Sequence, residues 1–509
     1  MTRFSFPRPS AIAPRRDAAA RLARLGFGLG LAWLAGCTMG PDYKRPEVPM
    51  APAWRTVVSN GADLANALWW TSFSDPHLDK LIDDALESNK DLQLATYRID
   101  EFDARLQVSR SSNYPLLGAN SGAGREHRSQ ERPNGLQPGA SPNLSNVEGG
   151  GSLSWEIDLW GRVKRSNEAA LAELMSAEET RRGVMLSLVA SVATSYVQLL
   201  ERDNQLAYAK RLLKNREDLL ALYELRYRGG SGTRLSVEQV RAEVDSQRTE
   251  IPPIERDIAT LENALSGLIG RRAGPIPRRK LDDLKLPEIP RGLPADILSR
   301  RPDVMAAEQS LIAANARIGV AKTGYFPTLS LTAAFGLGAD DPRWLTARTA
   351  RTGSIGASLV GNLFDGGRVA GDVREAEAVQ RQKEVIFQQS VQTALREVED
   401  AFVWRQKSAQ REAEITRLIG TLGEVTKLSR LRYEGGQTTF KDVLDAELQL
   451  LQVESRLGQS RQETLLSLIS VYRAMGGGWM LEVDKRRAVT VPPSEVQAQA
   501  TSQKEALQK

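Results

Sequence analysis

The chain has 509 residues, with 68 Lys and Arg against 63 Asp and Glu, two histidines and one cysteine. A mean hydropathy of −0.35 excludes a membrane protein built from many spanning helices, because each span needs about 20 apolar residues. One cysteine excludes an internal disulfide, and two histidines exclude a histidine-rich metal site.

The formal charge of +5 comes from the N-terminus. Six arginines and one aspartate precede Cys37, so the rest of the chain is neutral overall. A nucleic-acid partner requires a basic surface, and no nucleic-acid-binding function is therefore expected.

Residues 1–36 have the pattern of an export signal peptide. Arginines precede an apolar run at 25–34 that is too short to span a membrane as a helix, and the run ends Leu34-Ala35-Gly36-Cys37. This ending resembles the lipobox of bacterial lipoproteins, in which the cysteine is lipidated and becomes the mature N-terminus. Thr38 stands where lipoproteins of the inner membrane usually have aspartate, so the resemblance implies the outer membrane. The alternative is a free cysteine close to a membrane.

Prolines and polar residues mark 37–66 as a lipidated tether. A first structural repeat is expected over 67–270. It begins with an amphipathic helix that ends at about Ser111, in which apolar residues recur at three- and four-residue steps: Leu78, Leu81, Ile82, Ala85 and Leu86.

Near Pro115 the hydrophobic period changes to two. The pattern predicts a weak strand at about 116–124, a loop at 125–150 and then a clear strand. In that strand Leu153, Trp155, Ile157 and Leu159 alternate with Ser152, Ser154, Glu156 and Asp158. Strands at about 328–337 and 354–359 repeat the plan, so each half of the chain contributes one hairpin with a long loop.

These strands, about four per chain, have the length and the alternation of strands that cross a bilayer. Four strands cannot close a barrel, for which about eight is the minimum, and open edges are not viable in lipid. Chains that span a membrane in this way must pool their strands, and three chains would supply twelve. The alternative is a soluble pair of β-hairpins.

A long helix is expected after each hairpin. Residues 166–228 keep a helical pattern without proline, over about 90 Å at 1.5 Å per residue, with a coiled-coil seam at Met185, Val189, Val192, Tyr196 and Leu199. Returning helices are expected at 235–269, bent or broken at Pro252-Pro253, and at 440–475. Such lengths suit a tube or spacer, and a soluble coiled-coil oligomer is the alternative.

One constant offset relates the two halves of the chain. It carries residues 225–230 (Leu-Arg-Tyr-Arg-Gly-Gly) onto 431–436 (Leu-Arg-Tyr-Glu-Gly-Gly), and Gly270 onto Gly476. An internal tandem duplication is therefore expected, with a connector at 271–294, a second repeat at 295–479 and a C-terminal tail at 480–509. Because glycine ends helices in left-handed conformations, each repeat is expected to form a helical hairpin whose tip is the double glycine.

Several motifs resemble the TolC-type outer-membrane efflux protein family, in its NodT-like lipoprotein branch. The motifs lie at 155–162, 292–304, 314–322, 325–327, 364–368, 397–401 and 476–479, so the resemblance covers nearly the whole mature chain. It implies an α+β fold, in which a homotrimer forms an outer-membrane β-barrel of twelve strands. A long periplasmic α-helical coiled-coil barrel with a mixed equatorial belt continues it.

The resemblance also implies a function and partners. The trimer would be a channel, anchored in outer-membrane lipid at Cys37, that passively conducts small molecules such as drugs and toxic compounds to the cell exterior. Its cargo would come from an inner-membrane transporter of the resistance-nodulation-division (RND) type through a periplasmic adaptor (membrane fusion) protein. Within the family the alternatives are type I protein secretion and metal-ion efflux, and outside it a periplasm-spanning lipoprotein with no conduit.

No enzyme activity or cofactor is expected, because the sequence has no phosphate-binding loop, metal-ligand spacing or nucleophile constellation. By resemblance the periplasmic tips narrow to a closed gate. Asp445 matches the acidic residue that the family places near the constriction, and Asp442 lies one turn earlier on nearly the same helix face. Rings of such carboxylates favour cations, although acidic residues in a first turn also interact favourably with the helix dipole. Lys441 departs from the apolar residue usual in the family, and its spacing allows an ion pair with Asp445.

The two tips are also expected to contact the adaptor. The residues concerned are Gly229 and Gly230 in the first tip and Gly435 and Gly436 in the second. The alternative is that these glycines serve only as turns.

Overall fold

The computed structural model describes residues 38–50, 52–55, 61–62, 68–127, 143–286, 289–290, 297–477, 479–480 and 483–484. The expected signal peptide, Cys37 and most of the expected C-terminal tail lie outside these residues. The described chain divides into two compact units. The first contains residues 38–45, Phe102–Glu173 and Leu311–Lys383, and the second contains Pro46–Glu101, Leu174–Ser310 and 384–484.

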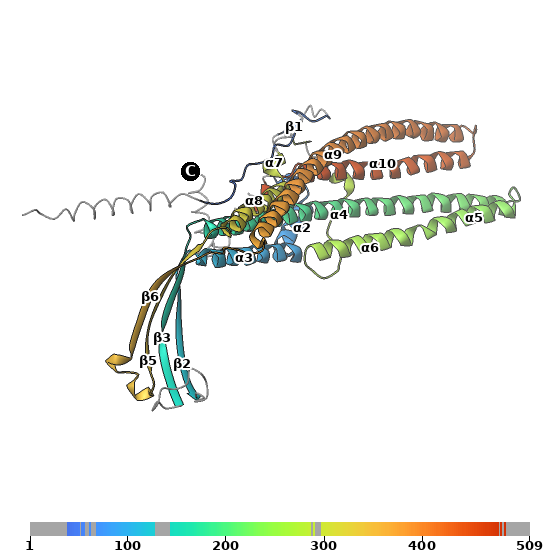
Figure 1. The fold of residues 1–509 in the computed structure, drawn as a ribbon. Coiled ribbons are helices and arrows are strands. Elements are labelled where there is room, and N and C mark those ends of the chain that lie inside the picture. Colours follow the sequence, from blue (N-terminus) through green and yellow to red (C-terminus); the bar gives the residue numbers. More distant parts are fainter. Residues whose placement is uncertain are drawn as a thin grey trace, which may run out of the picture. The chain divides into compact units, whose positions relative to one another are not determined.

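Most of the chain is helical (Figure 1). The α-helices are α2 (Pro76–Ser88), α3 (Lys90–Ser111), α4 (Arg162–Arg228), α5 (Arg234–Thr249), α6 (Ile251–Leu268), α7 (Ile297–Arg300), α8 (Pro302–Thr323), α9 (Arg368–Glu434) and α10 (Phe440–Ala474). Single turns of 3-10 helix are η1 (Trp69–Phe73), η2 (Leu281–Asp283), η4 (Pro342–Trp344) and η5 (Arg348–Ala350).

The two longest helices, α4 and α9, have 67 residues each, which corresponds to about 100 Å. The returning helix of the first hairpin is broken, because α5 ends at Thr249 and α6 begins at Ile251. Pro252 and Pro253 lie in the first turn of α6, where a missing N–H is tolerated. The predicted break is thus confirmed, and α10 runs unbroken for 35 residues.

Helix α4 is the one helix, among the described residues, that is long and apolar enough by composition to cross a membrane. Of its most apolar 18-residue window, 61% is buried inside the protein. The predicted seam residues Met185, Val189, Val192, Tyr196 and Leu199 are all fully buried. We therefore explain the apolarity of α4 by packing within the protein.

The first unit contains a four-stranded antiparallel sheet in the order β2-β3-β5-β6 (Figure 1). Its strands are β2 (Leu116–His127), β3 (Asn143–Ile157), β5 (Thr328–Ala339) and β6 (Arg351–Val360). The pairing of β3 with β5 joins the two hairpins. Strands β2 and β6 are the outer edges, and among the described residues each has a neighbouring strand on one side only.

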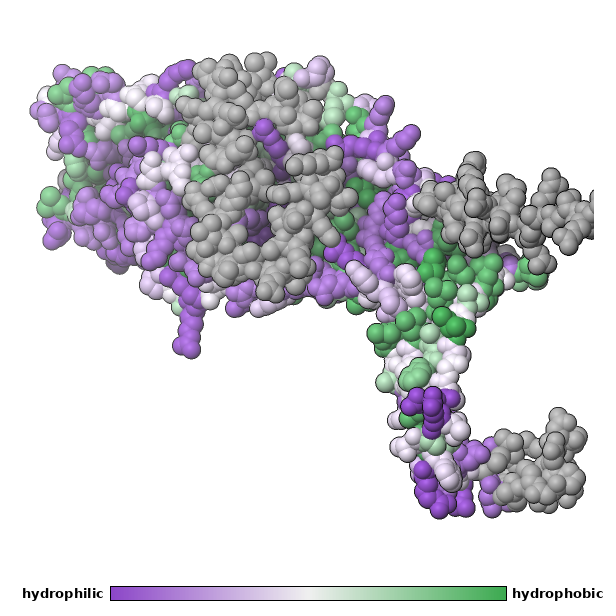
Figure 2. All heavy atoms as spheres, turned by 90° about the vertical axis from the view of Figure 1, so that its left-hand side faces the viewer, coloured by the Kyte–Doolittle hydropathy of each residue, from purple (hydrophilic) through white to green (hydrophobic). Residues whose placement is uncertain are grey.

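Register separates the sheet into two chemically different faces. Leu153 pairs with Leu117 and with Ala333, and Ala333 pairs with Ile355, so these side chains share one face. The opposite face has serine, threonine and glycine at most positions, as in the paired series Gly118, Ser152, Ala334 and Ser354. In the sheet, Figure 2 shows hydrophobic surface near the ends that join the helices and hydrophilic surface at the far end.

The sequence misplaced the ends of the first hairpin. Residues 125–150 were expected to form a loop, but β2 continues to His127 and β3 begins at Asn143. The register runs without interruption through Gly149, Gly150 and Gly151. Ladder hydrogen bonds use the backbone, so a glycine run that shows no alternation of side chains still pairs.

Glycine is required at one point of this ladder. A Cβ on Gly150 would lie 2.6 Å from the carbonyl oxygen of Phe335 and 2.8 Å from the Cα of Gly336. Strands β3 and β5 approach too closely there for any larger residue.

The second unit is organised around an aromatic core. Trp69 stacks on Tyr472 with ring centroids 5.1 Å apart, and Trp70 meets Trp479 edge-on at 4.9 Å. The Tyr196 hydroxyl donates to Asp75 Oδ2 at 2.6 Å, and burial, reinforced by this carboxylate, raises the pKa of Tyr196. A two-residue parallel bridge, β1 (Gly61–Ala62) with β4 (Ile289–Pro290), also belongs to this unit.

Candidate functional site

The turn between α9 and α10 forms the second helical tip. The N–H of Gly436 donates to Tyr433 O at 2.9 Å, and that of Gln437 donates to Arg432 O at 2.8 Å. Gly436 has φ of +70°. A left-handed glycine with these two bonds ends a helix in the manner of a Schellman motif.

The turn between α4 and α5 repeats this geometry at the first tip. Gly230 N donates to Tyr227 O at 3.1 Å, and Ser231 N donates to Arg226 O at 2.9 Å. Gly230 has φ of +73°. Both double glycines therefore form the predicted helix-ending turns.

The second glycine of each tip faces open space. A Cβ on Gly230 or Gly436 would meet no described atom within 4 Å, although their positive φ would strain any other residue. Gly229 and Gly435 do not have a positive φ, and a Cβ on them would lie 3.4 and 3.5 Å from the nearest atom, which is ordinary contact. The tips thus have room for a docked partner, and the two kinds of glycine can be distinguished by substitution.

Asp442 caps the helix in which it lies. Its Oδ2 accepts hydrogen bonds from Thr439 N at 2.9 Å and from the Thr439 hydroxyl at 2.7 Å, within a capping box at the start of α10. The hydroxyls of Thr438 and Thr439 lower the pKa of Asp442 to about 2. Two roles were considered for Asp442, a carboxylate of the gate and a stabiliser of the helix terminus. Its hydrogen bonds correspond to the second role.

Asp445 has a different partner. Lys441 Nζ forms an ion pair with Asp445 Oδ2 one turn along α10, and this hydrogen bond raises the pKa of Lys441. Both side chains remain about 40% exposed. The ion pair that the spacing of Lys441 and Asp445 allowed is therefore present.

A small apolar cluster joins the two hairpins near their tips. Leu219 of α4, Val240 of α5 and Leu444 of α10 are buried against one another, with Tyr223 and Phe440 beside them. Leu444 lies between Lys441 and Asp445 in the sequence and points into this cluster. The start of α10 is therefore held against the first hairpin by apolar packing.

In the first unit, the segment that follows Cys37 is fixed by Arg165. Met39 N donates to Trp160 O at 3.0 Å. Arg165 Nε donates to Met39 O at 3.2 Å, and Arg165 Nη2 pairs with Asp42 Oδ1 at 2.7 Å. Arg165 is only 4% exposed, and its guanidinium lowers the pKa of Asp42.

Close backbone approach completes this attachment. A Cβ on Gly319 of α8 would lie 2.6 Å from Met39 O, and one on Gly40 would lie 2.5 Å from the Cα of Gly319. Asn315 Nδ2 also donates to Pro41 O at 2.8 Å. Residues 39–42 therefore bind to α4 and α8 through both their backbone and an ion pair.

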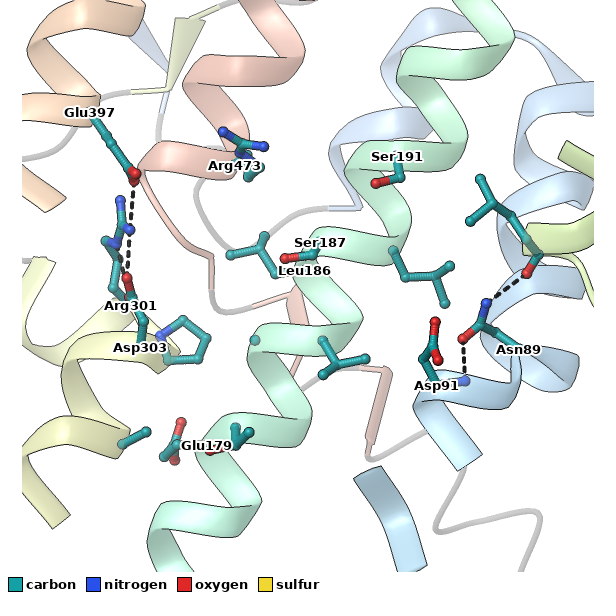
Figure 3. A pocket seen from close by; sticks show the side chains of 17 residues that line it. Asn89, Asp91, Glu179, Leu186, Ser187, Ser191, Arg301, Asp303, Glu397 and Arg473 are labelled. Atoms are coloured by element: carbon teal, nitrogen blue, oxygen red, sulfur yellow. Dashed lines mark hydrogen bonds and ion pairs between the residues drawn. The ribbon is translucent and has the colours of Figure 1, made fainter. Parts of the chain in front are cut away.

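In the second unit, a buried arginine joins three helices (Figure 3). Arg301 precedes α8 and bonds to Asp303 at 2.7 Å and to Glu397 of α9 at 2.8 Å. Its Nη1 donates to Ala474 O, the carbonyl at the end of α10, at 3.0 Å. Arg301 is 7% exposed, whereas the side chains of Asp303 and Glu397 are 50% and 36% exposed. The buried acceptor that would be costly without this donor is the Ala474 carbonyl.

These residues line a groove of about 820 Å³ that crosses α4. Figure 3 shows Ser187 and Ser191 on α4, with the Arg301 ion pairs to one side and Asn89 and Asp91 to the other. Asn89 caps α3 by accepting from Leu92 N at 3.0 Å. Neither histidine of the chain is among the lining residues, so the groove contains no serine–histidine pair.

A buried carboxyl group lies between α4 and α10. Glu201 is 1% exposed, and its Oε2 has no hydrogen-bond partner among the described residues. A Cβ on Gly458 of α10 would lie 2.8 Å from this oxygen. Burial raises the pKa of Glu201 to about 7, against hydrogen bonds from Gln205 and Asn204 that lower it.

Within the described ranges, no group of three or more His, Cys, Asp or Glu residues has the arrangement of a metal site. The titratable side chains described above whose pKa is shifted cap a helix, form ion pairs or are buried between helices. The candidate functional residues therefore lie at helix ends and at contacts between packed helices.

The sequence matches the model of the family described as "Outer membrane efflux protein" over residues 81–271 and again over 293–477. These matches cover most of the chain. The chain belongs to the outer membrane efflux protein family. Relatives within this family are named after different cargoes, as two of them illustrate.

The chain is 32% identical over 463 residues to the cation efflux system protein CusC of Escherichia coli O157:H7, covering 89% of this chain and 98% of CusC. It is 30% identical over 459 residues to the toluene efflux pump outer membrane protein TtgI of Pseudomonas putida, covering 88% and 97%. The fold is similar to the open state of the MtrE outer membrane channel of Neisseria gonorrhoeae, with a TM-score of 0.78, 29% identity, and coverage of 87% and 99%.

In this efflux protein the structure brings together some predicted site residues and adds others. Lys441 and Asp445 pair, whereas Asp442 turns to its helix cap. Arg165 and Arg301 were not singled out from the sequence. Arg301 lies in the quoted family motif at 292–304, which was the one sequence feature that could have drawn attention to it.

Proposed function

We propose that the protein is the outer-membrane channel of a tripartite efflux system and that it passively conducts small molecules, such as drugs and toxic compounds, to the cell exterior. One observation carries the proposal. A sheet with one apolar face and two unpaired edges occurs in a member of the efflux family whose helices reach 67 residues. A conduit explains both features, and an enzyme explains neither.

Closure of the sheet requires further copies of the chain. An open edge is not viable in lipid, so β6 of one copy would pair with β2 of the next. Three copies would give twelve strands, within the range of outer-membrane barrels. We infer a homotrimer, in which α4 and α9 continue the barrel across the periplasm and the aromatic core of the second unit forms an equatorial belt.

We also propose that the chain arose by tandem duplication. The equal lengths of α4 and α9 and the matching tip hydrogen bonds support it. The repeats of each copy would then alternate around the helical barrel.

The chain would be anchored in the outer membrane by lipid on Cys37. The lipobox supports this, as does the attachment of residues 39–42 by Arg165. A fixed segment directly after the lipidated residue keeps the anchor beside the sheet.

The tips would contact a periplasmic adaptor, through which the channel meets an RND-type inner-membrane transporter. Gly229, Gly230, Gly435 and Gly436 leave the tip surface uncovered, which suits end-to-end docking. The ion pair of Lys441 and Asp445 would contribute to the closed gate. Asp442 would stabilise the start of α10, where this pair lies.

The cargo class rests on the family. CusC is named for cation efflux and TtgI for toluene efflux, and the two are 32% and 30% identical to this chain. Metal-ion efflux is therefore the second candidate function, and type I protein secretion the third.

The decisive experiment is crosslinking in cells from the tips. A photoreactive residue at Ser231 or Gln437, both in the tip turns, should capture an adaptor together with a proton-driven transporter. The same residue at Glu414, an exposed position within α9, is the matched control. Capture of an ATP-driven exporter instead would assign the channel to secretion.

Conduction is tested separately with purified protein in planar bilayers. Ion-conducting events are expected, and a protein that inserts without conductance would instead be a structural lipoprotein. Asp445→Ala should raise the leak of the closed state and change its ion selectivity. An unchanged leak would remove Asp445 from the gate.

Docking is tested with the two kinds of tip glycine. Gly229→Trp and Gly435→Trp add bulk without backbone strain, because these residues do not have a positive φ. They should reduce adaptor crosslinking and efflux while the trimer still forms. Gly229→Ala and Gly435→Ala are the controls, and full efflux with both tryptophans would leave the glycines as turns only.

A further inference from the structure

Two arginines lie on the apolar face of the sheet at the end that carries the loops. Arg351 is the first residue of β6 and pairs in register with Leu337. It therefore shares a face with Ile355 and Leu359, which are four and eight residues further along the strand. Arg125 of β2 pairs with Ser145 and shares the corresponding face with Leu117.

This face is exposed within the chain. Ile355 is 91% exposed and Leu359 is 64% exposed. Arg125 and Arg351 are also exposed, and no described residue accepts a hydrogen bond or forms an ion pair with either guanidinium. Arg343 in the neighbouring loop is different, because Asp341 neutralises it through a two-point ion pair.

Depth along the strand places the arginines at a membrane surface. Arg351 lies eight residues from Leu359, which is about 27 Å along a strand and about 20 Å in height when the strand is tilted by about 40°. The apolar band of outer-membrane barrels is about 25 Å tall. With Leu359 near one boundary, the guanidinium of Arg351 reaches the headgroups at the other.

The loop end is the outer end if the protein spans the membrane as proposed above. The opposite strand ends lead into α4 and α9, which are long and charged and belong in water. Trp344, which is 66% exposed in the loop before β6, fits the same boundary, because tryptophan is enriched at membrane–water interfaces.

We propose that Arg351 and Arg125 form a binding site for the phosphate groups of outer-leaflet lipids. Arginine binds phosphate through two parallel N–H···O bonds and is weakly hydrated, so it suits this role at the edge of an apolar face. A lysine or a hydroxyl would not give the same fork geometry. This inference rests on the proposed outer-membrane channel.

Assembly would complete the site. Arg125 and Arg351 lie on the two edge strands, which are three strand spacings or about 14 Å apart. Register places Arg351 level with Leu337, Gly149 and Ser121, so Arg125 lies four residues further toward the loops and the two arginines do not meet within one chain. When β6 of one copy pairs with β2 of the next, these two strands become neighbours, and both arginines then face lipid at the loop end of the barrel. One lipid could then be held between two copies by two cations.

The test is lipid retention by the purified full-length protein in detergent, measured by native mass spectrometry. The probes are bisphosphorylated lipid A, phosphatidylglycerol and zwitterionic phosphatidylethanolamine. We expect the double variant Arg125→Gln and Arg351→Gln to lose about tenfold or more of its affinity for the phosphate-bearing anionic probes, since each bidentate contact contributes a severalfold factor. Retention of phosphatidylethanolamine should stay within about twofold, because its own ammonium group offsets the charge of its phosphate.

The probes also identify the source of the phosphate. Loss confined to lipid A assigns the site to the glycolipid, whereas equal loss of phosphatidylglycerol assigns it to any anionic lipid. Arg417→Gln, an exposed arginine of α9, is the matched control for the loss of surface charge. Unchanged retention by the double variant, or an equal loss with Arg417→Gln, overturns the proposal.

Failure of this site and failure of the channel are distinguishable. The single-channel conductance of the double variant should equal that of the wild type, because neither arginine lies on the polar face of the sheet. Loss of lipid with normal conductance supports the site. Normal conductance with no loss of lipid overturns the site and leaves the channel function intact.

Discussion

Replacing Glu201 by glutamine should stabilise the protein at alkaline pH. Glu201 is buried between α4 and α10, and its Oε2 lacks a described hydrogen-bond partner. The charged groups that act on it are Arg202 on the same helix and Asp282 of η2. Glutamine keeps the shape of the protonated acid and removes the charge.

The size of the effect follows from the pKa. Burial raises the pKa of Glu201 from 4.5 to about 7, which corresponds to about 3 kcal/mol between the folded and unfolded states. Between these values the folded protein keeps the proton that the unfolded chain has released. Stability therefore falls as pH rises from about 4.5 to 7 and stays low above that range.

The assay compares wild type and Glu201→Gln by thermal unfolding at several pH values. The two should unfold alike at about pH 4, and the variant should become more stable by up to about 3 kcal/mol at pH 8. Taking the difference between the two proteins removes the contribution of other titrating groups. Equal stability at pH 8 would show that Glu201 is hydrated or paired, and the reasoning from its burial would be wrong.

Three further outcomes are expected. Arg301→Ala should lower the stability of the protein in thermal unfolding by about 2 kcal/mol, because it leaves the buried Ala474 carbonyl without its donor and removes the packing of a buried side chain; a change below about 0.5 kcal/mol would contradict this. Gly319→Val should displace the backbone at Met39, 2.6 Å from the new Cβ, and make residues 38–42 sensitive to protease, with no change in cleavage counting against the attachment. Gly150→Ala should prevent outer-membrane assembly, whereas Gly149→Ala, whose Cβ has no neighbour closer than 3.9 Å, should assemble normally.

The sequence predicted the features that depend on local chemistry. The double glycines located both tips because few other residues adopt a positive φ, and Pro252 with Pro253 located the break between α5 and α6. The alternation at Leu153, Trp155 and Ile157 predicted a two-faced strand, and the register confirms it. Its first residues were missed because a glycine-rich stretch has no side-chain alternation to detect.

Contacts between distant segments could not be predicted in the same way. Glu201 lies in a Glu-Arg-Asp run that looks solvent-exposed, and only the approach of α10 buries it. In the sequence Arg165 cannot be distinguished from the many other arginines in helices. Only the folded structure shows that it contacts Met39 and Asp42. The spacing of Lys441 and Asp445 allowed their ion pair, whereas the hydrogen bonds from Thr439 that make Asp442 a helix cap were not recognised from the sequence.

The unpaired edges β2 and β6 have a genetic consequence. If each barrel is built from three chains, then one chain with a damaged edge spoils the barrel to which it contributes. When intact and damaged chains are made in equal amounts and mix at random, roughly one barrel in eight contains only intact chains. A single substitution on either edge strand should therefore act dominantly. A cell that carries one intact and one damaged copy of the gene should lose most of its efflux.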